Sequence, residues 1–290
     1  MVAHSPHAAV IRAHAKINLG LLVTGKRSDG YHDIVTVFHR IALADSLTLE
    51  PSPAITVHTS HPHVPSGEAN ICHAAARLVA AELGPGEGVR VEISKEIPVG
   101  AGLGGGSADA AALLCALPRF WGGELPPDTL RSLALRLGAD VPYFLRSGSA
   151  LGTGRGETLE YFTLDLPFAI LLCTPPLHVS TAWAYGHVTP RARPGIDLRA
   201  LIERGLAETR ALPGALVNDF EEPVFRAHPA IASIRERLIR EGAIAASMSG
   251  SGSSVYGLFA SAADAGRARA AFPPSTCLTS VTPPFWRETP

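Results

Sequence analysis

The sequence predicts an α+β protein with two lobes, and three observations lead to this prediction. Strand-like alternation fills much of residues 10–59, and Ala- and Leu-rich helical stretches follow it. Strand and helix patterns alternate again from about residue 158 onward. The chain has 290 residues, whereas a single hydrophobic core stops growing near ~250–300 residues. We therefore expect an N-terminal β-rich/α lobe over residues 1–157 and a C-terminal α+β lobe over residues 158–290.

The overall composition argues against several functional classes. The chain carries 25 basic and 26 acidic residues, and 46% of its residues are hydrophobic. This balance indicates neither disorder nor a polyanion-binding surface, so no nucleic-acid partner is predicted. The cysteines at positions 72, 115, 173 and 277 lack the spacing of zinc or redox motifs and are expected to be reduced core thiols.

Targeting and membrane patterns are not found in the sequence. The first residues show no secretory pattern, and no apolar run approaches the ~20 residues that cross a bilayer. We therefore expect a soluble cytoplasmic protein with no membrane partner, present as a monomer or a weak homodimer.

The first predicted element is a strand from Val10 onward that carries two polar residues. Lys16 and Asn18 are two positions apart, so their side chains share one face of the strand. A single lysine is most often a solvated charge, but this one lies between Ala15 and Ile17 in an apolar stretch. Lys16 is therefore interpreted as a fixed positive charge.

A turn at residues 25–30 and a returning strand over Tyr31–Leu43 complete a predicted hairpin. His32 lies at the start of this strand, and taken alone it is more often a surface histidine than a functional one. Further strands are predicted at Ser46–Glu50, Ala54–Thr59 and Val89–Ile93. Helices are predicted at Asn70–Leu83, from the glycine loop to Pro118, and at Pro127–Leu137, Leu198–Ala211 and Ala230–Glu241.

Glycine dominates the stretch Pro98–Ala112, with five glycines in the seven positions 100–106. Glycine contributes nothing to a core but allows unusual backbone angles and close approach of backbone N–H groups. Ala and Leu, the best helix formers, follow directly. The loop therefore leads into a helix N-terminus, which favours a bound phosphate. The expected nucleotide-binding residues are Pro98, Val99, Gly100, Ala101, Gly102, Leu103, Gly104, Gly105, Gly106, Ser107 and Ala108.

The same glycines allow other interpretations. Gly100-x-Gly102-x-x-Gly105 satisfies the dinucleotide fingerprint, so an NAD-dependent oxidoreductase is an alternative. Against it, the preceding strands form a meander, and the acid at the expected distance, Glu124, lies in a Gly- and Pro-rich loop. A Walker P-loop is excluded because no Gly-Lys-Ser/Thr ends the loop. A merely flexible turn needs one or two glycines rather than five.

Two later segments add candidates. Asp140 precedes Val141-Pro142, so it is a helix N-cap, a functional carboxylate or both. Ser249–Ser253 reads Ser-Gly-Ser-Gly-Ser before an apolar strand, which favours a second loop of backbone donors near phosphates over a flexible turn. Ser149–Glu157 is also small and glycine-rich.

Taken together, these motifs resemble those of the GHMP kinases. Pro98-Val-Gly-Ala-Gly-Leu-Gly-Gly-Gly-Ser-Ala is similar to their ATP-binding signature, Pro-x-x-x-Gly-Leu-Gly-Ser/Gly-Ser/Gly-Ser/Ala-Ala. Ala15-Lys-Ile-Asn-Leu-Gly, Arg27-Ser-Asp-Gly-Tyr-His, Leu137-Gly-Ala-Asp-Val-Pro and the Ser-Gly-Ser-Gly-Ser run are similar to further motifs of one branch. The resemblance spans residues 15–254. It implies a two-lobe GHMP kinase fold with the active site in the cleft between the lobes.

This branch implies an ATP-dependent kinase that uses Mg²⁺. The resemblance implies that the acceptor is the 2-hydroxyl of 4-diphosphocytidyl-2-C-methyl-D-erythritol, in non-mevalonate isoprenoid precursor biosynthesis. Homoserine or mevalonate are alternative acceptors, but they leave Tyr31 and His32 without a role. Asp140 matches the catalytic aspartate, and Lys16 matches its partner, which would keep Asp140 ionised.

The resemblance also implies individual contacts. Ser107 would contact phosphate or Mg²⁺, and Asn70 would lie on the adenine side. Tyr31 and His32 would recognise cytosine, with Tyr185 as a second aromatic plate. The implied substrate contacts are Asn18, Tyr31, His32, Thr181, Tyr185, Gly250 and Ser251.

Overall fold

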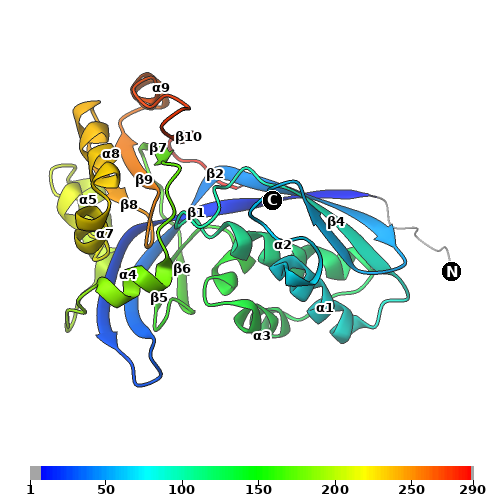
Figure 1. Cartoon of the computed structure of the whole chain (residues 1–290). Helices are drawn as coiled ribbons and strands as arrows, with labels where there is room; N and C mark the ends of the chain where they lie inside the picture. Colours follow the sequence, from blue (N-terminus) through cyan, green and yellow to red (C-terminus); the bar gives the residue numbers. More distant parts are fainter. Residues whose placement is uncertain (1–7, 289–290) are drawn as a thin grey trace. The chain divides into compact units, whose positions relative to one another are not determined.

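The computed structural model describes residues 8–288, which form two compact units (Figure 1). Unit 1 comprises the residues up to Ala15, Ala44–Val99 and Gly104–Ser147. Unit 2 comprises Lys16–Leu43, Gly100–Leu103 and the residues from Gly148 onward. The lobe boundary near residue 157 stays a prediction. Residues 1–7, on which the expected lack of a secretory pattern rests, lie outside the described residues.

Unit 1 is a sheet with helices on one face (Figure 1). Its strands are β3 (Thr56–Thr59), β4 (Gly88–Ser94) and the C-terminal part of β2 (His32–Ser52), in the order β3-β4-β2. β3 runs parallel to β4, and β4 runs antiparallel to β2 with Leu49 opposite Val91. The helices are α1 (Ile71–Leu83), α2 (Gly105–Phe120) and α3 (Pro127–Leu137), with the short 3₁₀ helices η1 (Gly67–Ala69) and η2 (Val141–Leu145).

Two predicted boundaries in the first half of the chain differ from the structure. The stretches predicted as separate strands at Tyr31–Leu43 and Ser46–Glu50 form the single strand β2. Asp45, which lies between them, forms no turn, because its side chain is buried and accepts the N–H groups of Glu96 and Ile97. Helix α2 does not stop at Pro118 but continues to Phe120. The proline lies close to the helix end, and the Trp121 N–H still bonds the Leu117 carbonyl at 3.0 Å.

Unit 2 contains an antiparallel sheet in the order β10-β7-β9-β8. Its strands are β7 (Ala169–Thr174), β8 (Ala245–Met248), β9 (Val255–Phe259) and β10 (Leu278–Thr282). Helix α8 (Pro229–Arg240) packs on β8 and β9, and α9 (Ala262–Arg269) packs on β7. The strands β1 (Ala9–Lys26), β5 (Ser149–Thr153) and β6 (Thr158–Phe162) belong to the six-stranded sheet that contains β2, β3 and β4. In that sheet β1 pairs with β2, and β5 and β6 follow β2 in the order β2-β5-β6. The remaining helices are α4 (Thr181–His187), α5 (Leu198–Ala207), α6 (Leu212–Ala215) and α7 (Glu221–Ala227).

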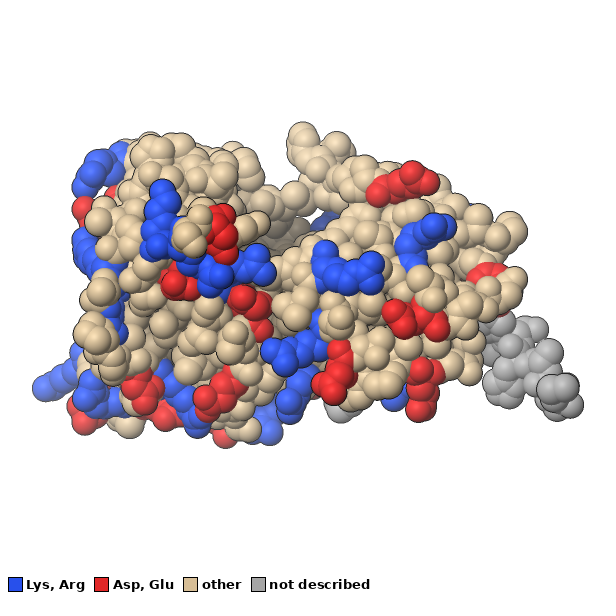
Figure 2. All heavy atoms as spheres, turned by 90° about the horizontal axis from the view of Figure 1, so that it is seen from below, with Lys and Arg blue, Asp and Glu red and all other residues tan. Residues whose placement is uncertain are grey.

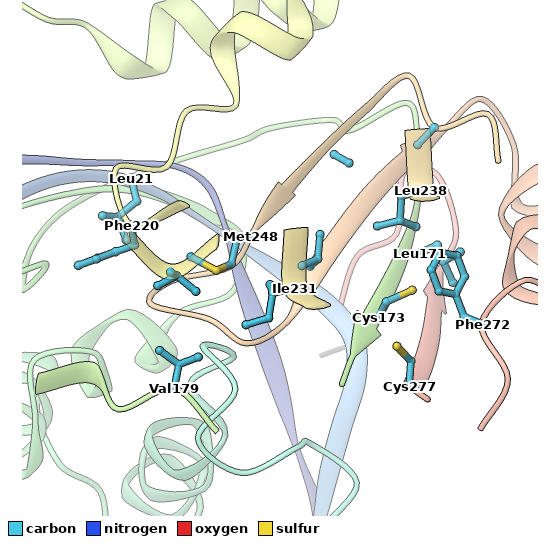
Figure 3. Packing of buried hydrophobic residues seen from close by; sticks show 14 of the residues in the cluster. Leu21, Leu171, Cys173, Val179, Phe220, Ile231, Leu238, Met248, Phe272 and Cys277 are labelled. Atoms are coloured by element: carbon cyan, nitrogen blue, oxygen red, sulfur yellow. The ribbon is translucent and has the colours of Figure 1, made fainter. Parts of the chain in front are cut away.

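The core of unit 2 joins these strands to their helices (Figure 3). Cys173 and Cys277 lie in this core near Phe272. Burial raises the pKa of the Cys173 thiol, with a smaller contribution from Cys277, and keeps it protonated. Cys72 is buried as well, as expected, but the prediction of a core thiol was wrong for Cys115, which lies in α2 and is exposed.

The surface carries both signs of charge. On the face drawn in Figure 2, Lys and Arg side chains are interspersed with Asp and Glu side chains. Among residues 8–288, no helix is both long enough and apolar enough to cross a membrane.

Candidate active site

Lys16 is a buried lysine in unit 2. It lies on β1 with 4% of its surface exposed, and its Nζ donates a hydrogen bond to Asn18 Oδ1 at 2.8 Å. The same nitrogen lies 5.4 Å from the centroid of the Phe38 ring, within the range of a cation–π interaction. Because a buried ammonium is costly without such partners, these contacts hold the charge in one place.

A hydrogen-bond chain fixes Asn18 in turn. Asn18 Nδ2 donates to Thr36 Oγ1 at 2.7 Å, and the Thr36 hydroxyl donates to the Gly20 carbonyl at 2.6 Å. Tyr256 donates from its hydroxyl to the Asn18 carbonyl at 3.0 Å. Asn18 therefore orients Lys16, a role that the sequence interpretation did not give it. Thr36 and Tyr256 were missed altogether, because a hydroxyl in an apolar strand gives no pattern.

Three motifs that are distant in sequence meet in unit 2. The Lys16 N–H donates to the Leu103 carbonyl at 3.0 Å, which ties β1 to the glycine loop. Ser249 Oγ donates to the Gly102 carbonyl at 2.9 Å and accepts from the Asn18 N–H at 3.3 Å. A Cβ atom added at Gly102, where φ is +80°, would lie 2.1 Å from the Ser249 carbonyl oxygen. Only glycine allows the two loops to approach this closely.

The Ser-Gly-Ser-Gly-Ser segment is an ordered loop held by side chains. Gly250 and Gly252 have φ values of +57° and +89°. Asn218 Nδ2, which sequence reasoning missed, donates to the Met248 and Gly250 carbonyls at 2.7 and 2.9 Å. The hydroxyls of Thr181 and Ser251 lie 3.1 Å apart. The structure thus brings these two predicted substrate residues together.

The unit 1 part of the glycine loop ends in a helix N-terminus. Gly104 is the N-cap of α2 with φ +69°, and its carbonyl accepts the Ala108 N–H at 2.8 Å. The first helical residues are Gly105, Gly106 and Ser107, so the earliest N–H groups have no intrahelical carbonyl to bond. These N–H groups and the positive end of the α2 helix dipole attract an anion.

A buried charge cluster that the sequence did not reveal supports the same helix. Lys95 Nζ contacts carboxylate oxygens of Asp45 and, at 2.7 Å, of Asp109. All three side chains are at most 4% exposed. Asp45 Oδ1 also accepts the N–H groups of Glu96 and Ile97, at 2.6 and 2.8 Å. The cluster therefore joins α2 to the residues that enter the glycine loop.

Asn70 and Asp140 both precede helices in unit 1 but differ in capping. Asn70 caps α1, with Oδ1 accepting the Cys72 N–H at 2.9 Å and Nδ2 donating to the Pro65 carbonyl at 2.7 Å. Asp140 occupies the N-cap position of η2, but its side chain makes no capping hydrogen bond. Of the two interpretations of Asp140, the structure thus gives no support to the structural cap.

An aromatic cluster forms in unit 2 around His32. The rings of His32 and Tyr185 stack with centroids 5.1 Å apart, and Tyr185 packs edge-on against Phe220 at 4.8 Å. Burial lowers the pKa of His32, with a smaller contribution from the charge of Lys26, so the imidazole is neutral at pH 7. Tyr31 lies next to this cluster in sequence and is 56% exposed.

The next question at this site is metal binding by the described residues. Among residues 8–288, no group of three His, Cys, Asp or Glu side chains could hold a metal ion. Mg²⁺ in kinases is commonly held by substrate phosphates with one or two protein ligands. The Ser107 hydroxyl, half-buried in the first turn of α2, fits such a minor role.

Comparison with known proteins identifies the family. The GHMP kinase N-terminal domain matches residues 70–148, and the GHMP kinase C-terminal domain matches residues 198–277. A 4-diphosphocytidyl-2-C-methyl-D-erythritol kinase from Chlorobium luteolum is 43% identical over 282 residues, covering 94% of this chain and 96% of the relative.

Solved structures agree with this result. A crystal structure of 4-(cytidine 5'-diphospho)-2C-methyl-D-erythritol kinase has a TM-score of 0.80 at 37% identity, covering 95% of this chain and 98% of its own. A homoserine kinase from Cytophaga hutchinsonii, at 20% identity and a TM-score of 0.71 over 96% of this chain and 95% of its own, shares the fold. The alternative of an NAD-dependent oxidoreductase is therefore wrong. By sequence and by structure, this chain belongs to the GHMP kinase family.

Proposed function

We propose that this chain transfers the γ-phosphoryl group of ATP to the 2-hydroxyl of 4-diphosphocytidyl-2-C-methyl-D-erythritol. The products are the 2-phosphate and ADP, in non-mevalonate isoprenoid precursor biosynthesis. Relatives that carry the name of this kinase share 41% to 44% identity with the chain. The structural observation that carries the proposal is the backbone hydrogen bond from the Lys16 N–H to the Leu103 carbonyl. It fastens the residue that carries the fixed cation to the expected phosphate-binding segment.

The triphosphate is assigned to the glycine loop. Glycines with positive φ at positions 100, 102 and 104 expose backbone N–H groups, and the α2 N-terminus adds the positive end of its dipole. Asn70 is assigned to the adenine side. Mg²⁺ bound to ATP would neutralise charge on the phosphates, and the Ser107 hydroxyl is the residue proposed to contact it.

Lys16 is assigned to the transferring phosphoryl group. Phosphoryl transfer is largely dissociative, so positioning and electrostatics contribute more than strong base character. A cation held by Asn18 and Phe38 needs little rearrangement when negative charge develops on the phosphoryl oxygens. Its burial strengthens that interaction, because the local dielectric is lower than in water.

Asp140 is assigned to the acceptor hydroxyl. The 2-hydroxyl is a hindered tertiary alcohol, so a carboxylate that orients it and accepts its proton lowers the barrier. The assignment is supported by the position of Asp140 directly before η2, where its side chain makes no capping hydrogen bond.

The cytidyl part of the acceptor is assigned to the aromatic cluster of unit 2. A neutral His32 offers one donor and one acceptor nitrogen to the polar edge of a base. Its ring contact with Tyr185 limits rotation of the imidazole. Thr181, Gly250 and Ser251 are assigned to the diphosphate, since a hydroxyl pair beside a left-handed glycine provides donors for anionic oxygens.

An acceptor comparison tests this function. ADP release is measured with ATP, Mg²⁺ and one of three acceptors: the cytidyl substrate, homoserine or mevalonate. We expect turnover with the cytidyl substrate at least 100-fold above the other two, because a site built for base contacts leaves its polar groups unpaired with smaller acceptors. Faster ADP release with homoserine or mevalonate would assign the chain to another branch of the family.

A further inference from the structure

The glycine-rich stretch Ser149–Glu157 consists of β5 and a tight turn over residues 154–157, which presents a single arginine. This turn connects β5 to β6 with Gly154 and Gly156 at φ +70° and +105°. The Gly156 N–H donates to the Thr153 carbonyl at 3.0 Å, and the Gly154 carbonyl accepts the Ile34 N–H at 2.7 Å. The turn is therefore fastened both internally and to β2.

Arg155 is held at the tip of this turn by Glu157. The backbone N–H of Arg155 donates to Glu157 Oε2 at 2.6 Å, and the side-chain Nε of Arg155 lies 3.5 Å from Glu157 Oε1. The side chain of Arg155 remains 35% exposed. Glu157 thus fixes the backbone of Arg155 and restricts its side chain, which is otherwise among the most flexible.

The guanidinium of Arg155 lies over the ring of Tyr31. Its Cζ atom is 4.8 Å from the ring centroid. Tyr31 itself is fixed at its backbone, where its N–H donates to Asp29 Oδ1 at 3.1 Å and its carbonyl accepts the Arg27 N–H at 2.8 Å. Even so, Tyr31 keeps 56% of its surface exposed. The Arg155 guanidinium covers one face of the Tyr31 ring, and a large part of the residue stays exposed and accessible to a ligand.

We propose that Arg155 is a specificity-determining residue that holds the Tyr31 ring as a stacking platform for the base of a nucleoside diphosphate acceptor. The inference rests on the proposed function and adds to it a residue outside the motifs that suggested the acceptor. A planar guanidinium stacks on an aromatic face and fixes its plane, which an ammonium does less well. A preoriented ring loses less entropy when a base stacks on it. Arg155 then acts on the acceptor and not on ATP.

The chain offers a matched control for this arginine. Arg199, on α5, lies over the ring of Phe162 with Cζ 4.3 Å from the centroid. It also pairs with a neighbouring acid, Glu203, and is 36% exposed. Arg155 and Arg199 therefore have the same kind of contact and the same exposure, but only Arg155 lies on a predicted acceptor residue.

The test measures binding of cytidine 5'-diphosphate by calorimetry, together with the KM values for the acceptor and for ATP. For Arg155→Met we expect the dissociation constant and the acceptor KM to rise about three- to tenfold, with the ATP KM and kcat unchanged. Arg155→Lys should give an intermediate value, and Arg199→Met should stay within twofold of wild type. In a Tyr31→Leu background, Arg155→Met should have no further effect, because the platform is already gone.

Other results would overturn the inference. Unchanged binding in Arg155→Met, an equal loss in Arg199→Met, or the same loss with and without Tyr31 would each remove the assigned role. If the wild-type protein turns over the cytidyl substrate and Arg155→Met behaves in the same way, the role of Arg155 is refuted but the proposed function stands. Wild-type protein that neither binds cytidine 5'-diphosphate nor turns over the substrate refutes the proposed function as well.

Discussion

At the residue scale, the proposed chemistry depends on Lys16 and Asp140. Replacing Lys16 by Met removes the charge with little change of volume, and Asp140→Asn removes the base while keeping the shape. We expect each change to lower kcat by about 10²- to 10⁴-fold, with ATP binding and the unfolding midpoint close to wild type. Steady-state kinetics and thermal denaturation measure both quantities. Asp128→Asn, an exposed acid in the first turn of α3, is the matched control. Near-normal turnover in Asp140→Asn would contradict the assignment of the base.

The hydrogen-bond chain behind Lys16 yields a second prediction. Thr36→Val leaves Asn18 Nδ2 without its acceptor, so Lys16 loses its fixed orientation. We expect kcat to fall about tenfold at an unchanged ATP KM, since an unpaired buried donor costs about 1–3 kcal/mol. Thr36→Ser should restore most of kcat.

A second buried threonine provides a control that distinguishes loss of Lys16 orientation from general loss of stability. Thr282 is 3% exposed, and its hydroxyl accepts the Ala42 N–H at 3.0 Å. Thr282→Val should lower the free energy of unfolding by a similar amount while kcat stays at the wild-type value. If kcat falls equally in both valine variants, the loss reflects general destabilisation and Thr36 does not position Lys16.

Single residues differ in how far the sequence predicted them. Lys16 and Asn18 were found because strand alternation puts them on one face, and His32 and Tyr31 because a family motif contains them. Thr36, Tyr256 and Arg155 were not found, because their roles depend on contacts between strands and turns that only the fold brings together. Lys95 was missed for the same reason, since both of its carboxylate partners are distant in sequence.

At the element scale, the glycine loop is fixed by its contact with the serine loop. Gly102→Ala would place a methyl group 2.1 Å from the Ser249 carbonyl oxygen at a φ of +80°. We expect the ATP KM to rise at least tenfold and the free energy of unfolding to fall by about 1–3 kcal/mol. Nucleotide binding and urea denaturation measure the two effects.

A glycine with free space around it provides the control. A Cβ atom at Gly86 would meet no heavy atom within 4 Å, and its φ lies outside the left-handed region. Gly86→Ala should therefore leave ATP binding unchanged. An unaltered ATP KM in Gly102→Ala would show that the approach of the two loops does not matter for the nucleotide.

Most elements were predictable from periodicity and from glycine and proline positions. The glycine loop, α1, α3 and β4 lie close to their expected ranges because each has a clear local pattern. Helix α5, in contrast, ends at Ala207 rather than residue 211, and the separate helix α6 follows it. The exact course of β2 was also not predictable, because a long strand that pairs with different neighbours along its length shows no single alternation.

At the scale of the whole molecule, pH affects stability through a buried histidine. His39 is 8% exposed, and its Nδ1 lies 2.8 Å from Ser149 Oγ. Burial lowers its pKa from 6.5 to about 4. Between pH 6.5 and pH 4, His39 therefore stays neutral in the folded state, whereas it takes up a proton in the unfolded state. The contribution of neutral His39 to the free energy of unfolding is fully present above pH 6.5 and is lost as the pH falls toward 4.

Unfolding in urea at pH 7 and pH 4.5 checks this prediction. Between pH 7 and pH 4.5, the free energy of unfolding should fall by about 2 kcal/mol more for wild type than for His39→Gln. The comparison with the variant removes the contributions of all other titrating groups. Parallel pH profiles for the two proteins would show that His39 does not control acid stability.

The α+β class followed from the strand and helix patterns, and the family followed from the motifs between residues 15 and 254; the comparisons confirm both. The interleaved composition of the two units did not follow, because residues 16–43 group with the C-terminal half only through long-range strand and loop contacts.

The measurement that tests the central claim most directly is the identification of the product by ³¹P nuclear magnetic resonance and mass spectrometry. Wild-type protein is incubated with ATP, Mg²⁺ and 4-diphosphocytidyl-2-C-methyl-D-erythritol, and ADP is quantified in the same sample. The proposed function predicts one new phosphomonoester on the 2-hydroxyl for each ADP formed. Release of inorganic phosphate in its place, or a phosphate on another hydroxyl of the acceptor, would contradict it.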